Sequence, residues 1–197
     1  MKAGRRIIAL APMEVTPTAI PDVKLITPKR HGDHRGFFSE VYSVAALRGH
    51  GIDTVFIQDN HSLSAEKGVV RGLHYQLPPA AQAKLIRVAR GAILDVAVDV
   101  RRGSPTFGRH VTEILSAENW RQILIPPGFA HGFVTLEPGS EVLYKVSALY
   151  APERERGILW SDPALGIDWG VDPAAAIQSA KDREYRRLAD VAPEDLF

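Results

Sequence analysis

The sequence contains no cysteine. Disulfide bonds, thiolate nucleophiles and thiolate metal sites are therefore excluded. An excess of either charge is also missing, because 24 lysines and arginines face 23 aspartates and glutamates, for a formal net charge of +1. This balance points to neither a nucleic acid nor a membrane surface as a partner. It leaves room for a local basic groove that binds a small phosphorylated ligand.

Long hydrophobic runs are missing too. No apolar run approaches the roughly 20 residues that a membrane-spanning helix requires. The run over residues 7–11 is too short for a signal peptide, and Pro12 ends it. We interpret residues 1–20 as an N-terminal arm, disordered or strand-forming, and residues 21–197 as a single domain with a C-terminal appendage. With no cysteines to indicate an oxidising compartment, a cytoplasmic location is the simplest interpretation.

The hydrophobic pattern is that of short β-strands. Runs rich in Val, Ile and Leu are separated by Gly, Pro, Ser and Asn turns. We expect strands over residues 55–58, 69–75, 83–89, 92–100, 110–115, 122–125, 132–136 and 141–149. Only residues 43–48 and the stretch after Ser179 have a helical pattern. This spacing predicts an all-β fold, an antiparallel sandwich or barrel with short peripheral helices.

The expected strand over residues 92–100 alternates strictly between two kinds of side chain. Its apolar face carries Leu94, Val96, Val98 and Val100. Because strand side chains alternate between faces, Asp95 and Asp99 lie on the opposite face. We interpret the apolar stripe as packing, and the two aspartates as ladder-edge or turn-supporting carboxylates.

Two motifs have the spacing of a metal-binding cupin but lack some of its ligands. Residues 68–76 fit Gly-x5-His-x-His, with His74 in place and Gln76 where the second histidine belongs. Residues 126–131 fit Pro-x-Gly-x2-His and end in His131. No glutamate follows at positions 80 or 81. Two histidines without a carboxylate make a poor metal site, so we predict a cupin barrel without metal.

The polar residues of this barrel suit acid–base chemistry. A histidine such as His74 is a side chain that can accept a proton at neutral pH. Lys84 or His131 can stabilise an oxyanion, Tyr144 can return a proton, and arginines bind phosphate. Together they fit proton abstraction next to a carbonyl in a phosphorylated or nucleotide-linked substrate. Taken singly, a histidine on a strand such as His74 is more often a structural residue than a base, and Tyr144 also fits a core residue.

At these residues the sequence resembles the dTDP-4-dehydrorhamnose 3,5-epimerase family. The resemblance extends over about residues 20–185, with motifs in family order at 32–40, 58–62, 71–76, 82–85, 95–99, 104–108, 125–133, 143–145 and 179–182. It implies a metal-free, homodimeric jelly-roll cupin that needs no cofactor. The implied substrate is a nucleotide sugar, dTDP-4-dehydro-6-deoxy-D-glucose, which is epimerised at C3 and C5 on the way to dTDP-L-rhamnose.

The resemblance also implies roles for the reacting groups. His74 would be the base that removes the protons from C3 and C5, which flank the C4 ketone. Asp182 would hold the imidazole and stabilise its cation, as a carboxylate partner of histidine does. Tyr144 would deliver a proton from the opposite face, which inversion requires. Lys84 would stabilise the enolate oxygen.

The substrate-binding residues are likewise implied by the resemblance. Arg71 would hold the diphosphate, His131 would lie near the sugar, and Gln58 and Asn60 would contact the nucleotide. Three further residues match positions that, in the family, contribute to the neighbouring subunit's site across the dimer interface: Arg35, Phe38 and Glu40. The aromatic pair that the family often has before a proline is here Leu149-Tyr150, which leaves open the side chain that stacks on thymine.

The spacing of Arg71 and His74 predicts an irregular strand. The two residues are three apart, so a regular strand would direct them to opposite faces. If both reach one ligand the backbone must bulge, and Gly72 is the natural place.

Three alternatives to the double epimerase remain at this point. A mono-epimerase acting at C3 or C5 alone would share nearly all these motifs. A metal-dependent cupin would use His74 and His131 as ligands. A non-catalytic nucleotide-sugar binding protein would keep the arginines and need neither His74 nor Tyr144.

Overall fold

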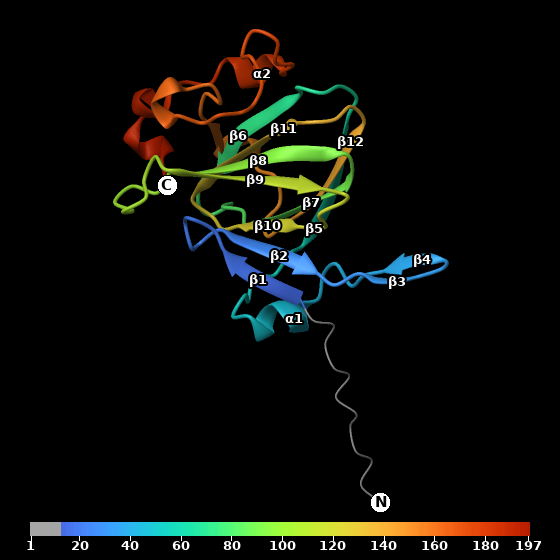
Figure 1. Cartoon of the computed structure of the whole chain (residues 1–197). Helices are drawn as coiled ribbons and strands as arrows, with labels where there is room; N and C mark the ends of the chain where they lie inside the picture. Colours follow the sequence, from blue (N-terminus) through green and yellow to red (C-terminus); the bar gives the residue numbers. More distant parts are fainter. Residues whose placement is uncertain (1–12) are drawn as a thin grey trace, which may run out of the picture.

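The computed structural model describes residues 13–197, which contain two facing antiparallel sheets (Figure 1). In spatial order, the six-stranded sheet consists of β1 (Met13–Pro17), β2 (Lys24–Pro28), β10 (Gln122–Ile125), β7 (Lys84–Arg90), β12 (Ser140–Val146) and β5 (Gln58–Ser64). The five-stranded sheet consists of β13 (Glu155–Gly157), β6 (Val70–Gln76), β11 (Phe129–Thr135), β8 (Ala92–Asp99) and β9 (His110–Ser116). All neighbouring strands in the two sheets pair antiparallel, as the jelly-roll prediction requires.

Strand β8 is buried on both of its faces. Ile93 and Ala97 point between the two sheets and join a core that includes Ile86 and Phe133. The predicted apolar stripe points the other way, where Val96 and Val98 join a second core with tryptophans and leucines of the C-terminal part. Burying a side chain of this size contributes about 1.5–3 kcal/mol. The five-stranded sheet is therefore held from both sides.

The C-terminal residues cover the outer face of the five-stranded sheet as an irregular appendage (Figure 1, red). Trp160 and Trp169 pack edge to face, with ring centroids 5.4 Å apart. The appendage contains β13, four short 3-10 helices and one short α-helix. These helices are η1 (Pro152–Arg154), η2 (Pro163–Leu165), α2 (Ala180–Arg183), η3 (Leu188–Asp190) and η4 (Pro193–Asp195).

Both predicted helices are present and each begins at a serine cap. The side chain of Ser43 accepts a hydrogen bond from the Ala46 N–H at the start of α1 (Val44–Gly49). The side chain of Ser179 accepts one from the Asp182 N–H at the start of α2. Satisfying a free N–H in the first turn is the reason serine is favoured there.

Most predicted strands are confirmed, but the first one was placed wrongly. The structure puts β5 at Gln58–Ser64 and gives residues 55–57 no strand. The apolar residues Val55 and Ile57 attracted the prediction, yet both are exposed, and the strand itself is mostly polar. Five short strands, β1, β2, β13 and the hairpin pair β3 (His31–Asp33) and β4 (Gly36–Phe38), were not predicted. Residues 1–12 of the expected arm lie outside the described residues, and β1 occupies part of the remainder.

The predicted bulge at Gly72 is confirmed by the pairing of β6 with β11. His131 lies opposite His74 and Phe133 lies opposite Arg71, so β6 has one residue more than its partner in this interval. Gly72 has φ +118°, and a Cβ atom there would lie 2.5 Å from the Gly132 Cα. Only glycine fits such a close approach of two backbones.

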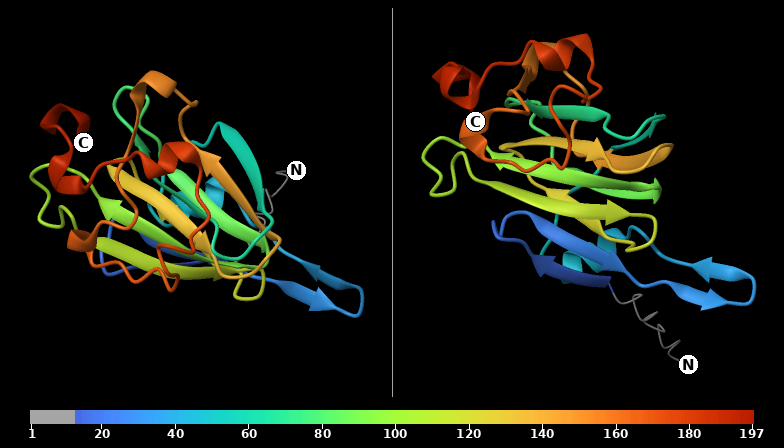
Figure 2. Two further views of the ribbon diagram at one scale, coloured as in Figure 1. Left: turned by 90° about the horizontal axis from the view of Figure 1, so that it is seen from above. Right: turned by 45° about the horizontal axis from the view of Figure 1, so that its top comes forward.

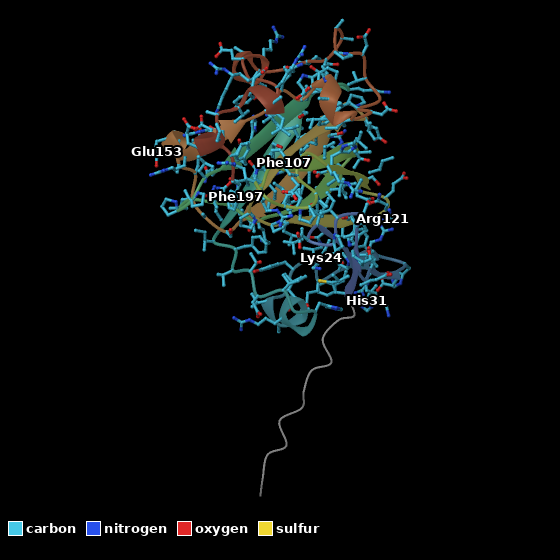
Figure 3. The ribbon with its side chains drawn as sticks, turned by 90° about the vertical axis from the view of Figure 1, so that its left-hand side faces the viewer. Lys24, His31, Phe107, Arg121, Glu153 and Phe197 are labelled. Carbon is cyan, nitrogen blue, oxygen red and sulfur yellow. The ribbon has the colours of Figure 1, made fainter. Side chains whose placement is uncertain are left out.

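The β3–β4 hairpin projects away from the two sheets (Figures 1 and 2). Figure 3 shows its first residue, His31, at the opposite end of the molecule from Glu153 of the C-terminal part. Within residues 13–197, no helix is long and apolar enough to span a membrane.

Candidate active site

Two adjoining cavities lie between the sheets and share His74, Lys84 and Tyr144. The larger, of about 270 Å³, is otherwise lined by Gln58, Asn60, Tyr75, Gln76, Gln82, Val146, Tyr150 and Glu155. The smaller, of about 180 Å³, is otherwise lined by Ser62, Arg71, His131, Phe133 and Val142. The Gly72 bulge is the reason that Arg71 and His74 line the same space.

His74 of β6 is held by Asp182 of α2. Its Nε2 lies 2.7 Å from Asp182 Oδ1, and Asp182 Oδ2 accepts a 3.4 Å hydrogen bond from the Gly72 N–H. Burial opposes ionisation of Asp182, but the hydrogen bonds that its carboxyl accepts, first of all the one from His74, outweigh it and hold the pKa of this carboxyl below its usual range. An ionised carboxylate can only accept, so Nε2 carries the proton. The Nδ1 lone pair of His74 is then free to act as a base.

Tyr144 of β12 lines the same cavities from the opposite sheet. Burial raises the pKa of its phenol above the ordinary value, against the opposing charge of Arg71. The phenol therefore stays protonated at neutral pH and can donate a proton. A ligand between the sheets would have His74 on one side and Tyr144 on the other.

Lys84 of β7 lines both cavities together with these two groups. Its Nζ is 3.5 Å from the His74 carbonyl oxygen, to which it donates. Burial lowers the pKa of this ammonium to about 8, although the charges of Asp95 and Glu155 oppose the shift. It remains mostly cationic at pH 7 and can stabilise a developing oxyanion.

The interpretation of Asp95 as a ladder-edge or turn-supporting residue was wrong. Asp95 is fully buried between the sheets, and its Oδ2 accepts a 2.9 Å hydrogen bond from His131 Nε2. Burial lowers the pKa of His131, against the attraction of Asp95. The signal was present in the sequence, since Asp95 alternates in step with the inward-facing Ile93 and Ala97.

Asp99, by contrast, supports a turn as expected. Its carboxylate accepts hydrogen bonds from Arg101, Ser104 and Thr106. Burial opposes ionisation, yet these donors lower its pKa to about 2.

Glu155 and Lys181, which meet Tyr150 beside the larger cavity, were missed in the sequence. The Tyr150 hydroxyl donates a 2.6 Å hydrogen bond to Glu155 Oε2, and Lys181 forms an ion pair with the same carboxylate. Tyr150 and Glu155 both line the larger cavity, and Tyr150 remains 57% exposed. Their chemical character alone gives no sign of this arrangement, because β13 and α2 meet only through the folding of the appendage.

The remaining predicted binding residues divide into two groups, and the first lies in the cavities. Gln58 and Asn60 of β5 line the larger cavity and are joined by a 2.8 Å hydrogen bond. Arg71 lines the smaller cavity and donates from Nε to Ser64 Oγ at 3.2 Å. The Arg71 guanidinium therefore lies next to β5 and lines the smaller cavity there.

The second group is not brought to the cavities within one chain. Arg35 lies on the projecting hairpin and pairs with Asp33 at 2.6 Å. Phe38 is on the same hairpin and is exposed. Glu40 lines a separate cavity of about 370 Å³ with residues of β7 and β12, and its Oε1 has no hydrogen-bond partner in residues 13–197. Their assignment to a neighbouring subunit stays a prediction.

The two histidines and the glutamine of the cupin motifs are all engaged in hydrogen bonds. The Nε2 atoms of His74 and His131 are engaged by Asp182 and Asp95 respectively. The amide of Gln76 is engaged by backbone groups. In the described part of the chain no group of three histidine, aspartate or glutamate side chains is placed to bind one ion.

Fold and site together define a jelly-roll protein with a polar interior equipped for acid–base chemistry on a small ligand. The model of the family described as dTDP-4-dehydrorhamnose 3,5-epimerase matches residues 17–190. The enzyme of that description from Pseudomonas aeruginosa is 54% identical over 181 residues, which cover 90% of this chain and 97% of the relative. The chain belongs to the dTDP-4-dehydrorhamnose 3,5-epimerase family.

Solved structures resemble this chain over nearly its whole length. A dTDP-6-deoxy-D-glucose-3,5-epimerase from Legionella pneumophila, crystallised with dTDP-4-keto-L-rhamnose, has a TM-score of 0.89 at 45% identity. The match covers 94% of this chain and 97% of that one. A 3'-monoepimerase from Streptomyces bikiniensis in complex with dTDP-quinovose has a TM-score of 0.81 at 37% identity, covering 88% of this chain and 87% of that one. The structures that resemble this chain thus include both a 3,5-epimerase and a 3'-monoepimerase.

The buried ammonium of Lys84 predicts that Lys84→Met stabilises the fold while it damages the site. The fall in pKa from 10.5 to about 8 corresponds to a cost on the order of 3 kcal/mol. Below about pH 8 the lysine is charged in both states and the cost is complete. The cost decreases above about pH 8 and disappears once the pH exceeds 10.5, the pKa of the lysine in the unfolded chain. We expect the variant to have the higher free energy of unfolding at about pH 7, and the difference to vanish above about pH 11.

Urea unfolding of both proteins at one protein concentration and two pH values measures this difference. A variant that is less stable at about pH 7, or a difference that does not change with pH, would contradict the prediction.

Proposed function

We propose that the protein epimerises dTDP-4-dehydro-6-deoxy-D-glucose at C3 and C5 by proton abstraction next to the C4 ketone. The observation that carries this proposal is the placement of His74, held by Asp182, across the cavity from the protonated Tyr144. Inversion at carbon needs a base on one face and an acid on the other. The two sheets supply one each.

The first chemical step is removal of a carbon-bound proton by Nδ1 of His74. The electron pair of the broken C–H bond moves toward the C4 oxygen and gives an enolate. Asp182 stabilises the imidazolium that forms, because the carboxylate is already ionised and hydrogen-bonded to Nε2. Lys84 stabilises the enolate oxygen through its charge, which is stronger in a partly dry cavity than in water.

The second step returns a proton to the same carbon from the opposite face. Tyr144 is the donor, because its raised pKa keeps it protonated until the carbanion needs the proton. His74 then releases its own proton to solvent, and Tyr144 is reprotonated from solvent. Repetition at the second carbon completes the double epimerisation.

The remaining cavity residues hold the substrate in place for these steps. Arg71 binds the diphosphate, for which a guanidinium is well suited, and His131 lies by the sugar. Gln58 and Asn60 contact the nucleotide. Tyr150 is the aromatic side chain beside them that can stack on the base, since Leu149 does not line the cavity.

We further infer that the enzyme acts as a metal-independent homodimer in the cytoplasm. The projecting hairpin supports the dimer, because its aromatic residues Phe37 and Phe38 are more than half exposed. Large exposed apolar groups of this kind are typical of interaction surfaces. Arg35 and Phe38 would reach the cavities of the partner subunit, and Glu40 would complete that contact.

Deuterium exchange tests the proposed reaction. When the chelator-treated enzyme is incubated with the 4-keto sugar nucleotide in D2O, we expect deuterium at both C3 and C5, read by mass spectrometry and proton NMR. Label at one carbon only would identify a mono-epimerase, as the resemblance to the Streptomyces enzyme allows. No label at either carbon, or activity only after metal is added, would overturn the proposal.

The division of labour between base and acid is tested by two variants. His74→Ala should lose at least about 10³-fold in turnover, in line with the contribution of general bases. Tyr144→Phe should slow net epimerisation more than it slows proton exchange, since abstraction does not need the phenol. Equal losses in both rates would contradict the role of Tyr144. A His74→Ala protein that keeps most of its turnover would contradict the role of His74.

Sharing of residues between subunits predicts complementation. His74→Ala lacks the base but keeps the hairpin, and the double variant Arg35→Ala/Phe38→Ala keeps the base but lacks the hairpin contacts. After equal mixing and subunit exchange, half the dimers are mixed and each contains one intact site, so about one quarter of the wild-type activity should return. Each variant measured alone is the control. A mixture no more active than the two variants alone would show that the hairpin does not serve the partner's site.

A further inference from the structure

The proposed reaction leaves two glutamines of the cavity wall without a role, the buried Gln76 and the half-buried Gln82. Gln76 occupies the motif position where a metal-binding cupin has its second histidine, and it is only 5% exposed. Its Nε2 donates to the carbonyl oxygens of Ala80 and Leu149, at 2.6 and 3.1 Å. Its Oε1 accepts a 2.9 Å hydrogen bond from the Ala151 N–H. The nitrogen of this amide thus donates to two backbone carbonyl oxygens, and its oxygen accepts from a backbone N–H.

Gln82 and its neighbour make matching bonds to the same stretch of chain. Gln82 Nε2 donates to the Ala148 carbonyl oxygen at 2.7 Å. The Ala83 N–H donates to Ser147 Oγ at 2.8 Å, and the Ser147 N–H donates to the Ala83 carbonyl oxygen at 3.1 Å. Residues 147–151, which we call the wall segment, are thereby tied to the barrel at four of their five positions.

Only an amide side chain can make the bonds of Gln76. The site presents two carbonyl oxygens that need donors and one N–H that needs an acceptor. A carboxylate has no proton to donate, and a neutral imidazole has one donor and one acceptor. At the position where a metal-binding cupin has a ligand, Gln76 therefore fixes the backbone by three hydrogen bonds, which we call the clamp.

The fifth residue of the wall segment is Tyr150, which stands between the two residues that Gln76 holds. Its side chain lines the larger cavity and donates to Glu155 of β13. Because Leu149 and Ala151 are both clamped, the position of the Tyr150 ring is set from its two neighbours. Ordering a loop before binding removes an entropic cost that the ligand would otherwise meet.

We propose that Gln76 and Gln82 are positioning residues that hold the wall segment ready to receive the nucleotide end of the substrate. They determine affinity for the nucleoside diphosphate and take no part in proton transfer. This inference rests on the proposed function, because it takes the nucleotide of the sugar substrate as the ligand of this cavity.

The test compares Gln76→Met with the wild type in nucleotide binding and in turnover. Methionine keeps the volume of glutamine but can neither donate nor accept a normal hydrogen bond. We expect binding of thymidine diphosphate, measured by calorimetry, to weaken about 10-fold, which is the effect of losing one to two net hydrogen bonds. The KM should rise by a similar factor, while kcat changes by less than about twofold.

A double variant separates positioning from general destabilisation. If Gln76 acts through the wall segment, its replacement should matter little once the aromatic ring is gone. In a Tyr150→Ala background, Gln76→Met should therefore weaken thymidine diphosphate binding by less than about twofold. The inference would be overturned if Gln76→Met weakened binding by the same factor in the wild type and in the Tyr150→Ala background. It would also be overturned if Gln76→Met lowered kcat alone.

Thr135→Val is the matched structural control. The Thr135 hydroxyl also bridges two backbone groups, donating to the Glu66 carbonyl oxygen and accepting from the Val69 N–H, in a loop that does not line either cavity. The Thr135→Val substitution should lower the melting temperature of the protein while leaving KM and nucleotide binding unchanged. Should Gln76→Met fail to fold, Gln82→Met removes one bond only and should weaken binding in the same sense.

The outcomes also separate this inference from the proposed function. A wild-type protein that does not bind thymidine diphosphate would refute the nucleotide-sugar substrate itself. A wild type that binds the nucleotide and epimerises the sugar, beside glutamine variants that bind it equally well, would refute only the clamp.

Discussion

The hydrogen bond between His74 and Asp182 joins two parts of the chain that are 108 residues apart. Strand β6 supplies the imidazole, and the short helix α2 supplies the carboxylate. Four residues are too few to hold a helix in place by themselves. The carboxylate can only meet the imidazole because the appendage is packed on the outer face of the five-stranded sheet, around Trp160 and Trp169. The second hydrophobic core is therefore a condition of the chemistry as well as of stability.

The bulge at Gly72 is the other local feature on which the site depends. Its extra residue turns Arg71 and His74 toward one cavity, and its N–H donates to the carboxylate that holds His74. One irregularity in a strand thus brings together the proposed phosphate-binding group, the proposed base and the carboxylate that holds this base. Bulges near active sites commonly redirect side chains in this way.

How far the sequence predicts this arrangement depends on the range of the interactions. The alternation in β8, the two short helices and the bulge follow from local rules and were predicted from a few residues each. The inward position of Asp95 could have been predicted from the same alternation, because Asp95 lies on the same face of the strand as Ile93 and Ala97. The meeting of Glu155, Lys181 and Tyr150 could not, because it depends on how an irregular tail with few periodic residues folds back. The pairing of His74 with Asp182 came from family resemblance alone, since no spacing rule connects residues so far apart.

The two imidazole–carboxylate pairs show how one barrel can give histidines different properties. His131 and Asp95 are buried together, so burial favours the neutral imidazole and its pKa falls. His74 is about one-third exposed in its side chain and opens to the cavity, so it can exchange a proton with substrate and solvent. The burial that makes His131 a fixed hydrogen-bonding group would suppress a base that must be protonated in every cycle. This difference in burial supports the proposed assignment of His74 as the base, even though both histidines have the same kind of partner.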